Sequence, residues 1–220
     1  MTILVRELGQ VDYATTYEAM LDFVAARRSS VATNTNAYDR PDDELWLLQH
    51  PPVYTLGKAG KHEHILNPGD IEVIQSDRGG QVTYHGPGQV VVYVLLDLKA
   101  HELGPKGLVR GIETAVIESL REYDLDAARR DGAPGVYLKD KKVASLGLRI
   151  KNGISYHGVA VNVDVNLKPF LGINPCGYAG LEVTRLIDHV PTINCENYSN
   201  KLIEMLLKQF DLGSQRKLAS

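Results

Sequence analysis

The sequence contains little cysteine and no long apolar run, and each absence excludes a class of protein. Cys176 and Cys195 are the only two cysteines among 220 residues. They lack the Cys-x-x-Cys spacing of a structural zinc site and are too few for a disulfide scaffold. The longest apolar run, residues 90–96, is far shorter than the roughly 18 residues of a membrane-spanning helix, and residues 1–10 lack the pattern of a secretion signal. We therefore expect a cytoplasmic protein that does not bind membranes.

The sequence also lacks an excess of positive charge. Its net charge is -3 and its pI is about 6.2. It has neither a basic stripe nor a basic amphipathic helix, the features typical of nucleic-acid binding. Small molecules or proteins, and not nucleic acid, are therefore the expected partners.

The hydrophobic pattern predicts a single α+β domain over residues 1–220. Helical spacing of apolar residues predicts helices within residues 13–24, 108–123 and 198–210. Short β-rich runs predict strands at residues 3–8, 45–49, 53–56, 71–75, 89–98, 136–138, 143–150 and 154–163. Because strands and helices do not alternate regularly, we expect a mixed, mostly antiparallel sheet with packed helices. Residues 29–43 are predicted to form an exposed loop and residues 213–220 a frayed tail.

Residues 77–89 form a glycine-rich segment between two apolar strands. Its glycines and its proline predict sharp turns and close approach of the backbone to a neighbour. The segment matches neither a Walker loop nor a dinucleotide fingerprint, so phosphate binding is not supported. Its polar side chains, Arg78, Thr83, Tyr84 and His85, suggest a mainly apolar pocket with a few directed hydrogen bonds. A long hairpin connection is the simpler interpretation.

A charged turn at residues 139–142 joins two further apolar strands. Strand alternation places Lys142 on the same face as Ala144, Leu146 and Leu148. Lysines at such a tip are usually solvated. A lysine directed inward at a partly apolar site would instead stabilise an adjacent anion. The sequence alone leaves both interpretations open.

Cys176 is the candidate nucleophile, because it lies in a Pro-Cys-Gly turn that keeps a thiol accessible on a rigid backbone. A nucleophilic cysteine needs a stabilised thiolate, and Lys142 is the natural candidate for that role. Cys195 has no comparable neighbourhood and is expected to pack. His157 lies in a strand with alternating apolar residues, and the sequence does not decide whether its role is structural or functional. The short His62-Glu63-His64 run is expected to be exposed, and no metal site is predicted.

Four separated motifs together resemble the octanoyltransferase family. They are residues 78–89, 142–147, 155–158 and 174–178, and residues 44–57 are similar to the family as well. The resemblance covers nearly the whole chain. Gln49 stands where many members carry an acid, and Ala144 where some carry a second cysteine; neither departure touches the proposed chemistry.

This resemblance implies the fold of biotin and lipoate protein ligases. It implies transfer of octanoyl from octanoyl-acyl carrier protein to a lysine on lipoyl domains of 2-oxoacid dehydrogenase complexes and on the glycine cleavage H protein, without a cofactor. Cys176 would be the acyl-thioester nucleophile and Lys142 its activator. The residues implied to line the acyl site are Arg78, Gly79, Gly80, Gln81, Val82, Thr83, Tyr84, His85, Ser145, Leu146, Gly147, His157, Gly158, Val159 and Ala160. An ATP-dependent lipoate or biotin ligase and a noncatalytic lipoyl-domain binding module remain as alternatives.

Overall fold

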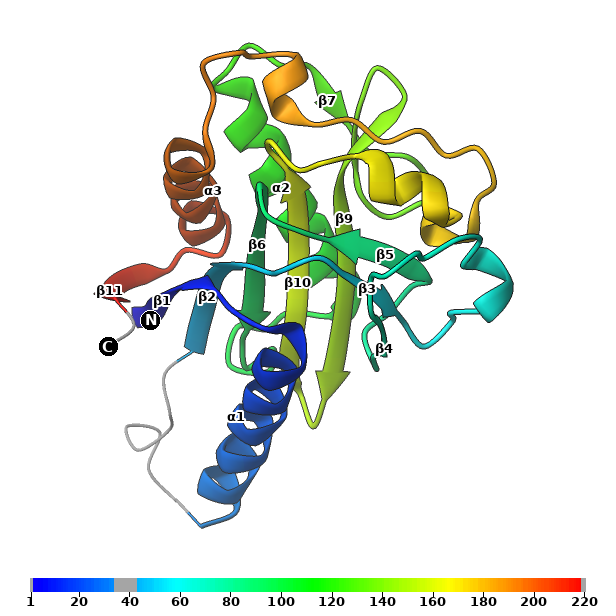
Figure 1. Ribbon diagram of the computed structural model, residues 1–220. Coiled ribbons are helices and arrows are strands. Elements are labelled where there is room, and N and C mark those ends of the chain that lie inside the picture. The colour runs from blue at the N-terminus through cyan, green and yellow to red at the C-terminus, as the bar shows by residue number, and fades with distance from the viewer. Residues whose placement is uncertain (1, 34–42, 219–220) are drawn as a thin grey trace.

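The computed structural model describes residues 2–33 and 43–218 (Figure 1). The helices are α1 (Tyr13–Thr33), α2 (Pro105–Arg121) and α3 (Cys195–Gln209). The strands are β1 (Thr2–Gln10), β2 (Asp43–Gln49), β3 (Val53–Leu56), β4 (Val73–Gln75), β5 (Val82–His85), β6 (Gln89–Leu95), β7 (Ala127–Ala128), β8 (Val136–Leu138), β9 (Lys141–Lys151), β10 (Ile154–Asn162) and β11 (Gly213–Leu218). Short 3-10 turns are η2 (His62–His64), η3 (Lys168–Gly172), η4 (Pro175–Gly177) and η5 (Leu186–Asp188).

The main sheet has eight strands in the order β11-β1-β2-β6-β10-β9-β8-β7. β1 runs parallel to both β11 and β2, and the other neighbours in this sheet are antiparallel. A second sheet of three strands has the order β4-β3-β5. The prediction of a mixed, mostly antiparallel sheet with packed helices is confirmed.

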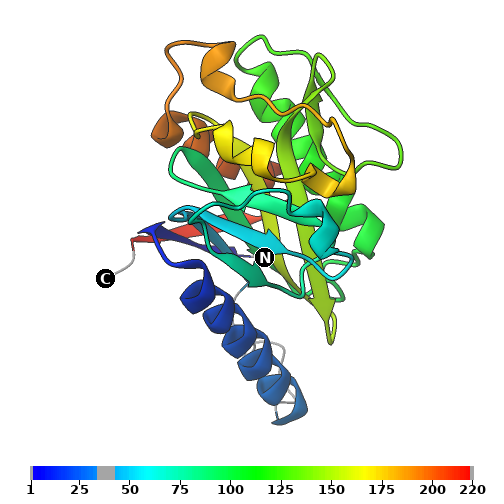
Figure 2. The ribbon, with the colours of Figure 1, turned by 45° about the vertical axis from the view of Figure 1, so that its right-hand side comes forward.

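Both faces of the main sheet are covered, and β6 shows how the sequence achieves this. Val92 and Val94 pack in a core cluster with residues of α2 and α3, whereas Val91, Tyr93 and Leu95 pack with Met20 and Val24 of α1. A strand buried on both faces reads as a continuous apolar run, which is what residues 90–96 show. Figure 2 shows α1 on one side of the sheet and α2 on the other.

Local signals start each helix. The Asp12 carboxylate accepts the backbone N–H of Thr15 at 2.9 Å, which satisfies one of the free donors at the start of α1. α2 begins with Pro105, whose missing N–H costs nothing in the first turn. In α3 the side chain of Asn194 accepts the backbone N–H of Asn197.

The predicted exposed loop at residues 29–43 is wrong at both ends. α1 continues to Thr33, since residues 29–33 contain neither glycine nor proline to stop it. Asp43 is a buried member of β2, where it forms an ion pair with Arg27 at 2.5 Å and also contacts His101. Residues 34–42 lie outside the described residues.

The predicted frayed tail at residues 213–220 also differs from the structure. Gly213–Leu218 forms β11, which pairs with the otherwise open side of β1 and so satisfies backbone groups on both strands. Residues 219–220 lie outside the described part of the chain. A further strand that was not predicted, β5, lies inside the glycine-rich segment, where Val82, Thr83 and Tyr84 have high β-propensity.

Candidate active site

Cys176 lies in the tight η4 turn with a left-handed backbone conformation, φ 57° and ψ 15°. Few residues other than glycine adopt this conformation, so the surrounding contacts must hold it. The N–H of Gly177 donates to the carbonyl of Asn174 at 2.9 Å, and the N–H of Asn174 donates to the carbonyl of His64 at 2.8 Å. The half-buried thiol is thus presented by a turn that is fixed from both sides.

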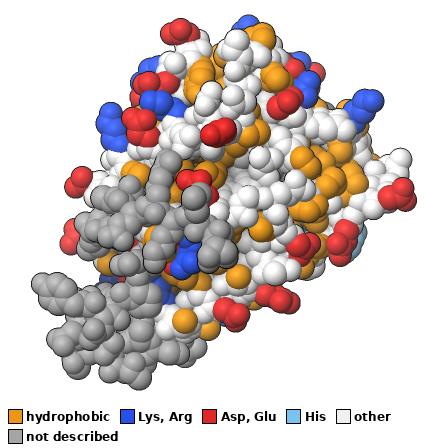
Figure 3. All heavy atoms as spheres, turned by 60° about the vertical axis from the view of Figure 1, so that its left-hand side comes forward, with side chains coloured by type: hydrophobic (Ala, Val, Ile, Leu, Met, Phe, Trp, Pro, Cys, Tyr) orange, Lys and Arg blue, Asp and Glu red, His pale blue; other side chains and the backbone are white. Residues whose placement is uncertain are grey.

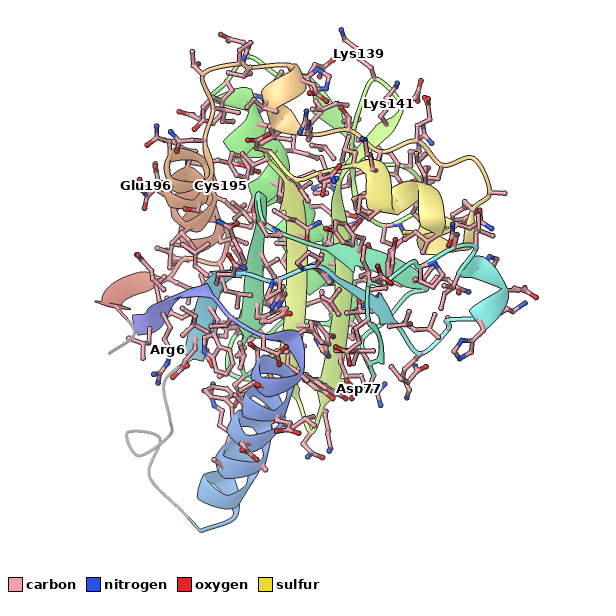
Figure 4. All side chains as sticks on the ribbon, viewed as in Figure 1. Arg6, Asp77, Lys139, Lys141, Cys195 and Glu196 are labelled. Carbon is pink, nitrogen blue, oxygen red and sulfur yellow. The ribbon has the colours of Figure 1, made fainter. Side chains whose placement is uncertain are left out.

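Lys142 is buried beside Cys176. Its Nζ lies 3.0 Å from the Cys176 Sγ and donates to the carbonyl of Pro134 at 2.9 Å. The side chain is 1% exposed, and Nζ sits 5.3 Å from the centre of the Tyr137 ring. In contrast, Lys139 and Lys141 extend from the tip of the same hairpin in Figure 4. The sequence left open whether Lys142 points inward or into solvent. In the structure Lys142 points inward, and Lys139 and Lys141 point into solvent.

The backbone of Lys142 is also fixed by the segment that follows η4. Its N–H donates to the carbonyl of Glu182, and its carbonyl accepts the N–H of Thr184, both at 2.9 Å. The chain therefore runs from the Cys176 turn directly into a bridge alongside Lys142. This connection brings together two residues that are 34 positions apart in the sequence.

Arg78 supplies a second cation near the thiol. It is buried, and its guanidinium donates to neutral acceptors, including the carbonyl of Thr55 at 2.6 Å and that of Gln81 at 2.7 Å. Among the described residues no carboxylate forms an ion pair with it. Burial lowers the pKa of Arg78, and attraction to the ionised forms of Tyr13 and Cys176 opposes that shift. A buried cation without a carboxylate partner favours negative charge in its surroundings.

Cys176 and Arg78 border a cavity with mainly apolar walls. Its lining consists of Tyr13, Arg78, Gly80, Gln81, Val82, Thr83, His85, Val91, Tyr93, Ser145, Leu146, Gly147, His157, Gly158, Val159, Ala160 and Cys176. Cys176 lies in this lining, with Lys142 in contact behind it. A thiol at an apolar cavity can carry an acyl group as a thioester, with the acyl chain bound in the cavity and the carbonyl carbon open to attack.

Two residues expected at the acyl site do not line this cavity. Tyr84 faces the opposite side of β5, where its ring packs against Tyr54 and Phe170. Gly79 donates its backbone N–H to the carbonyl of Leu148 at 2.9 Å, which attaches the glycine-rich segment to β9. Strand alternation accounts for Tyr84, since Thr83 and His85 on either side of it do line the cavity.

Three residues of the lining were not predicted: Tyr13, Val91 and Tyr93. Val91 and Tyr93 are two residues apart and so lie on the same face of β6. Because nearly every residue of this strand is apolar, the sequence does not show which face borders the cavity. Tyr13 begins α1, and its hydroxyl donates to Ser76 at 2.8 Å. No local pattern links Tyr13 to the site, because only the packing of α1 on the sheet brings it there.

The histidines at the site are neutral at pH 7. Burial, with smaller effects from the charges of His50 and Arg78, lowers the pKa of His85 to about 3. Its Nδ1 lies 2.7 Å from the Gln89 Oε1. Burial also lowers the pKa of His157, although the Asp77 carboxylate, 3.1 Å from its Nε2, opposes this shift. Neutral rings can accept or donate hydrogen bonds here but do not add positive charge near the thiol.

Buried His50 gives a prediction for stability against pH. Burial lowers its pKa from 6.5 to about 4. The unfolded chain therefore binds a proton at a higher pH than the folded protein. The contribution of His50 to the free energy of unfolding is fully present above pH 6.5 and is lost as the pH drops toward 4. The loss from this group is on the order of 3 kcal/mol. Denaturant unfolding at pH 7 and pH 4.5 should show a smaller fall for His50→Gln than for the parent; equal falls would contradict the prediction.

Two further features of the sequence are Cys195 and the short His62-Glu63-His64 run. Cys195 is half-buried at the start of α3, and burial raises the pKa of its thiol. His62 and Glu63 are exposed, but His64 differs from the expectation, because its side chain is half-buried. Among residues 2–33 and 43–218 no group of three metal-ligating side chains occurs. No helix in this part of the chain is long and apolar enough to cross a membrane. On the face in Figure 3, acidic and basic side chains are interspersed.

Comparison with known proteins identifies the family. The lipoyl protein ligase A/B catalytic domain matches residues 23–209. A curated octanoyltransferase from Dechloromonas aromatica is 51% identical over 96% of this chain and 98% of its own length. Another, from Pseudomonas fluorescens, is 51% identical over 99% of this chain and 96% of its own. The chain belongs to the octanoyltransferase family. As a member of this family it is an acyltransferase.

Solved structures of more distant relatives share the fold. A bi-partite lipoate protein ligase from Thermoplasma acidophilum superposes with a TM-score of 0.73 at 16% identity, covering 100% of this chain and 88% of that one. Lipoate-protein ligase A bound with ATP gives 0.73 at 16% identity, covering 100% and 89%. Biotin protein ligase from Aquifex aeolicus gives 0.51 at 12% identity, covering 96% and 68%. The predicted relation to the biotin and lipoate ligase fold is confirmed.

Proposed function

We propose that this octanoyltransferase moves an octanoyl group from octanoyl-acyl carrier protein to a lysine of lipoyl domains through a thioester on Cys176. The acceptors would be the lipoyl domains of 2-oxoacid dehydrogenase complexes and the glycine cleavage H protein. The observation that carries the proposal is the 3.0 Å contact between the Lys142 Nζ and the Cys176 Sγ at an apolar cavity. We place this reaction in the cytoplasm, where thiols stay reduced.

In the first step, the Cys176 thiolate attacks the carbonyl carbon of the donor thioester. The new C–S bond forms as the bond to the carrier sulfur breaks, and the Lys142 ammonium protonates the departing carrier thiolate. One thioester replaces another, so this step needs no external source of energy. The acyl chain enters the cavity, where burial of its methylene groups favours binding by roughly 0.8 kcal/mol each.

In the second step, the neutral amine of the acceptor lysine attacks the thioester on Cys176. The C–N bond forms, the Cys176 thiolate departs, and the Lys142 amine takes the proton that the incoming nitrogen loses. Lys142 is then an ammonium beside a thiolate again, which closes the cycle. Because an amide is more stable than a thioester, the transfer proceeds without ATP.

The tetrahedral intermediates of both steps carry an oxyanion, and β9 offers a donor for it. The carbonyl of Leu148 faces away from β10, because it accepts the N–H of Gly79. Residues two apart along a strand direct their backbone groups to the same side, so the N–H of Leu146 faces that side as well. Leu146 lines the cavity, which makes its N–H our candidate oxyanion donor.

A transfer assay tests this function. The purified protein is mixed with octanoyl-acyl carrier protein and an apo lipoyl domain, with no nucleotide present, and the mass of the lipoyl domain is followed. We expect acylation with ping-pong kinetics. Acylation that appears only with free octanoate and ATP would assign the chain to the ligase alternative. Binding of the lipoyl domain without acylation in either mixture would assign it to the noncatalytic alternative.

A further inference from the structure

Glu113 of α2 is a buried carboxylate that does not line the cavity. Its side chain is 7% exposed. Its Oε1 accepts the backbone N–H of Gly135 at 2.9 Å, and its Oε2 accepts the Arg129 Nε at 3.1 Å. Burying a carboxylate is costly unless it is paired and hydrogen-bonded, and both oxygens meet that condition. The carboxylate therefore fixes the Gly135 peptide firmly against α2.

The segment held by Glu113 is the one that holds Lys142. The carbonyl of Pro134, next to Gly135, accepts the Lys142 Nζ at 2.9 Å. Gly135, with φ +139°, lies so close that a Cβ built on it would be 2.9 Å from the Lys142 Cε and 3.1 Å from the Nζ. The lysine side chain thus runs along this peptide on its way to Cys176. The bond to Pro134 and the close contact with Gly135 therefore tie the position of the Nζ to this segment.

We infer that Glu113 is a positioning residue, which acts through the Pro134–Gly135 peptide to keep the Lys142 Nζ against the Cys176 thiol. The inference rests on the proposed function, because it assigns Glu113 a part in the same Lys142–Cys176 chemistry. The mechanism is indirect: the Glu113 carboxylate bonds to Gly135 and Arg129, and Glu113 is not part of the cavity lining. A displacement of about 1 Å at reacting groups costs up to ~100-fold in rate, so a peptide that sets this contact matters.

Three conservative variants test this inference. Glu113→Asp keeps the charge but is one methylene shorter, so it withdraws from Gly135. Glu113→Gln keeps the length and an acceptor oxygen. Glu118→Asp is the matched control on the same helix, where the Glu118 side chain is 41% exposed and pairs with Arg121. All are made with Cys195→Ser, so that Cys176 is the one remaining thiol.

The first readout is alkylation of Cys176 by iodoacetamide against pH, which requires no acyl donor. We expect Glu113→Asp to move the midpoint of the rate profile to higher pH and to slow acylation of Cys176 about tenfold. Glu113→Gln should have a smaller effect, because it keeps an acceptor for Gly135 but loses the one for Arg129, and Glu118→Asp should stay close to the parent. An unchanged profile in folded Glu113→Asp overturns the inference, even if its Tm falls. If Cys176 is alkylated as expected but never acylated, the proposed function fails while the inference stands.

The second readout is a double-mutant cycle with Lys142→Met. If Glu113 acts through Lys142, Glu113→Asp should slow Cys176 alkylation at pH 7 in the parent and have less than a twofold effect once Lys142 is methionine. An equal slowing in both backgrounds overturns the inference, because it would mean that Glu113 acts on the site by another route.

Discussion

Cys176→Ser should lower the rate of octanoyl transfer at least ~10³-fold while leaving the fold intact. A serine hydroxyl stays protonated at neutral pH and is a far weaker nucleophile than a thiolate. The Lys142 Nζ, 3.0 Å from the sulfur, is proposed to stabilise a thiolate and cannot ionise an alcohol to the same extent. The initial rate of lipoyl-domain acylation measures the loss, and an unchanged Tm establishes that the variant is folded.

Cys195→Ser is the matched control for this prediction. Cys195 is half-buried, like Cys176, but it lies at the start of α3 and is not part of the cavity lining. Its replacement should leave the transfer rate within about twofold of the parent. A Cys176→Ser protein with near-parent activity would exclude Cys176 as the acyl carrier, and a comparable loss in Cys195→Ser would show that the loss is not specific to Cys176.

Lys142→Met should lower the transfer rate by ~10²–10³-fold, the range of an acid–base group that also stabilises a nucleophile. Methionine has a similar length and no charge, so it fills the buried site while removing the cation. The Cys176 thiolate then loses its nearest positive partner. The midpoint of iodoacetamide alkylation against pH should therefore move upward, measured in a Cys195→Ser background to isolate one thiol.

Lys141→Met is the control at the adjacent position. The Lys141 side chain is 46% exposed and pairs with Glu182 at 3.4 Å, so its charge lies in solvent. Its substitution should leave both the alkylation profile and the transfer rate close to the parent. If Lys142→Met shows the parent profile with reduced transfer, Lys142 acts only in proton transfer and not in stabilising the thiolate.

The sequence named Lys142 and Cys176 as candidates, but it did not give the end of α1 or the strand β11. Strand alternation put Lys142 on the same face as apolar residues without deciding whether it points inward, and the Pro-Cys-Gly turn indicated an accessible thiol at Cys176; both are local signals. Their contact could not be read from the residues, since it depends on the bridge between Lys142 and Val183. The residues named Lys142 as a candidate partner of Cys176, and the resemblance to a family implied the same two roles.

The features that sequence reasoning missed depend on tertiary packing. β11 forms because it pairs with the open side of β1, and nothing in the sequence of residues 213–218 predicts this pairing. Tyr13 reaches the cavity because α1 packs across the sheet, and the buried carboxylate of Glu113 meets the N–H of Gly135 from 22 positions away. In each case the partner is distant in sequence, so periodicity and composition carry no information about it.

The most direct test is the intact mass of the protein after incubation with octanoyl-acyl carrier protein alone, under denaturing conditions and without ATP or an acceptor. We predict one octanoyl adduct on the parent and on Cys195→Ser, none on Cys176→Ser, and loss of the adduct when an apo lipoyl domain is added. An adduct that persists on Cys176→Ser, or transfer to the lipoyl domain without any adduct on the parent, would contradict a covalent intermediate on Cys176.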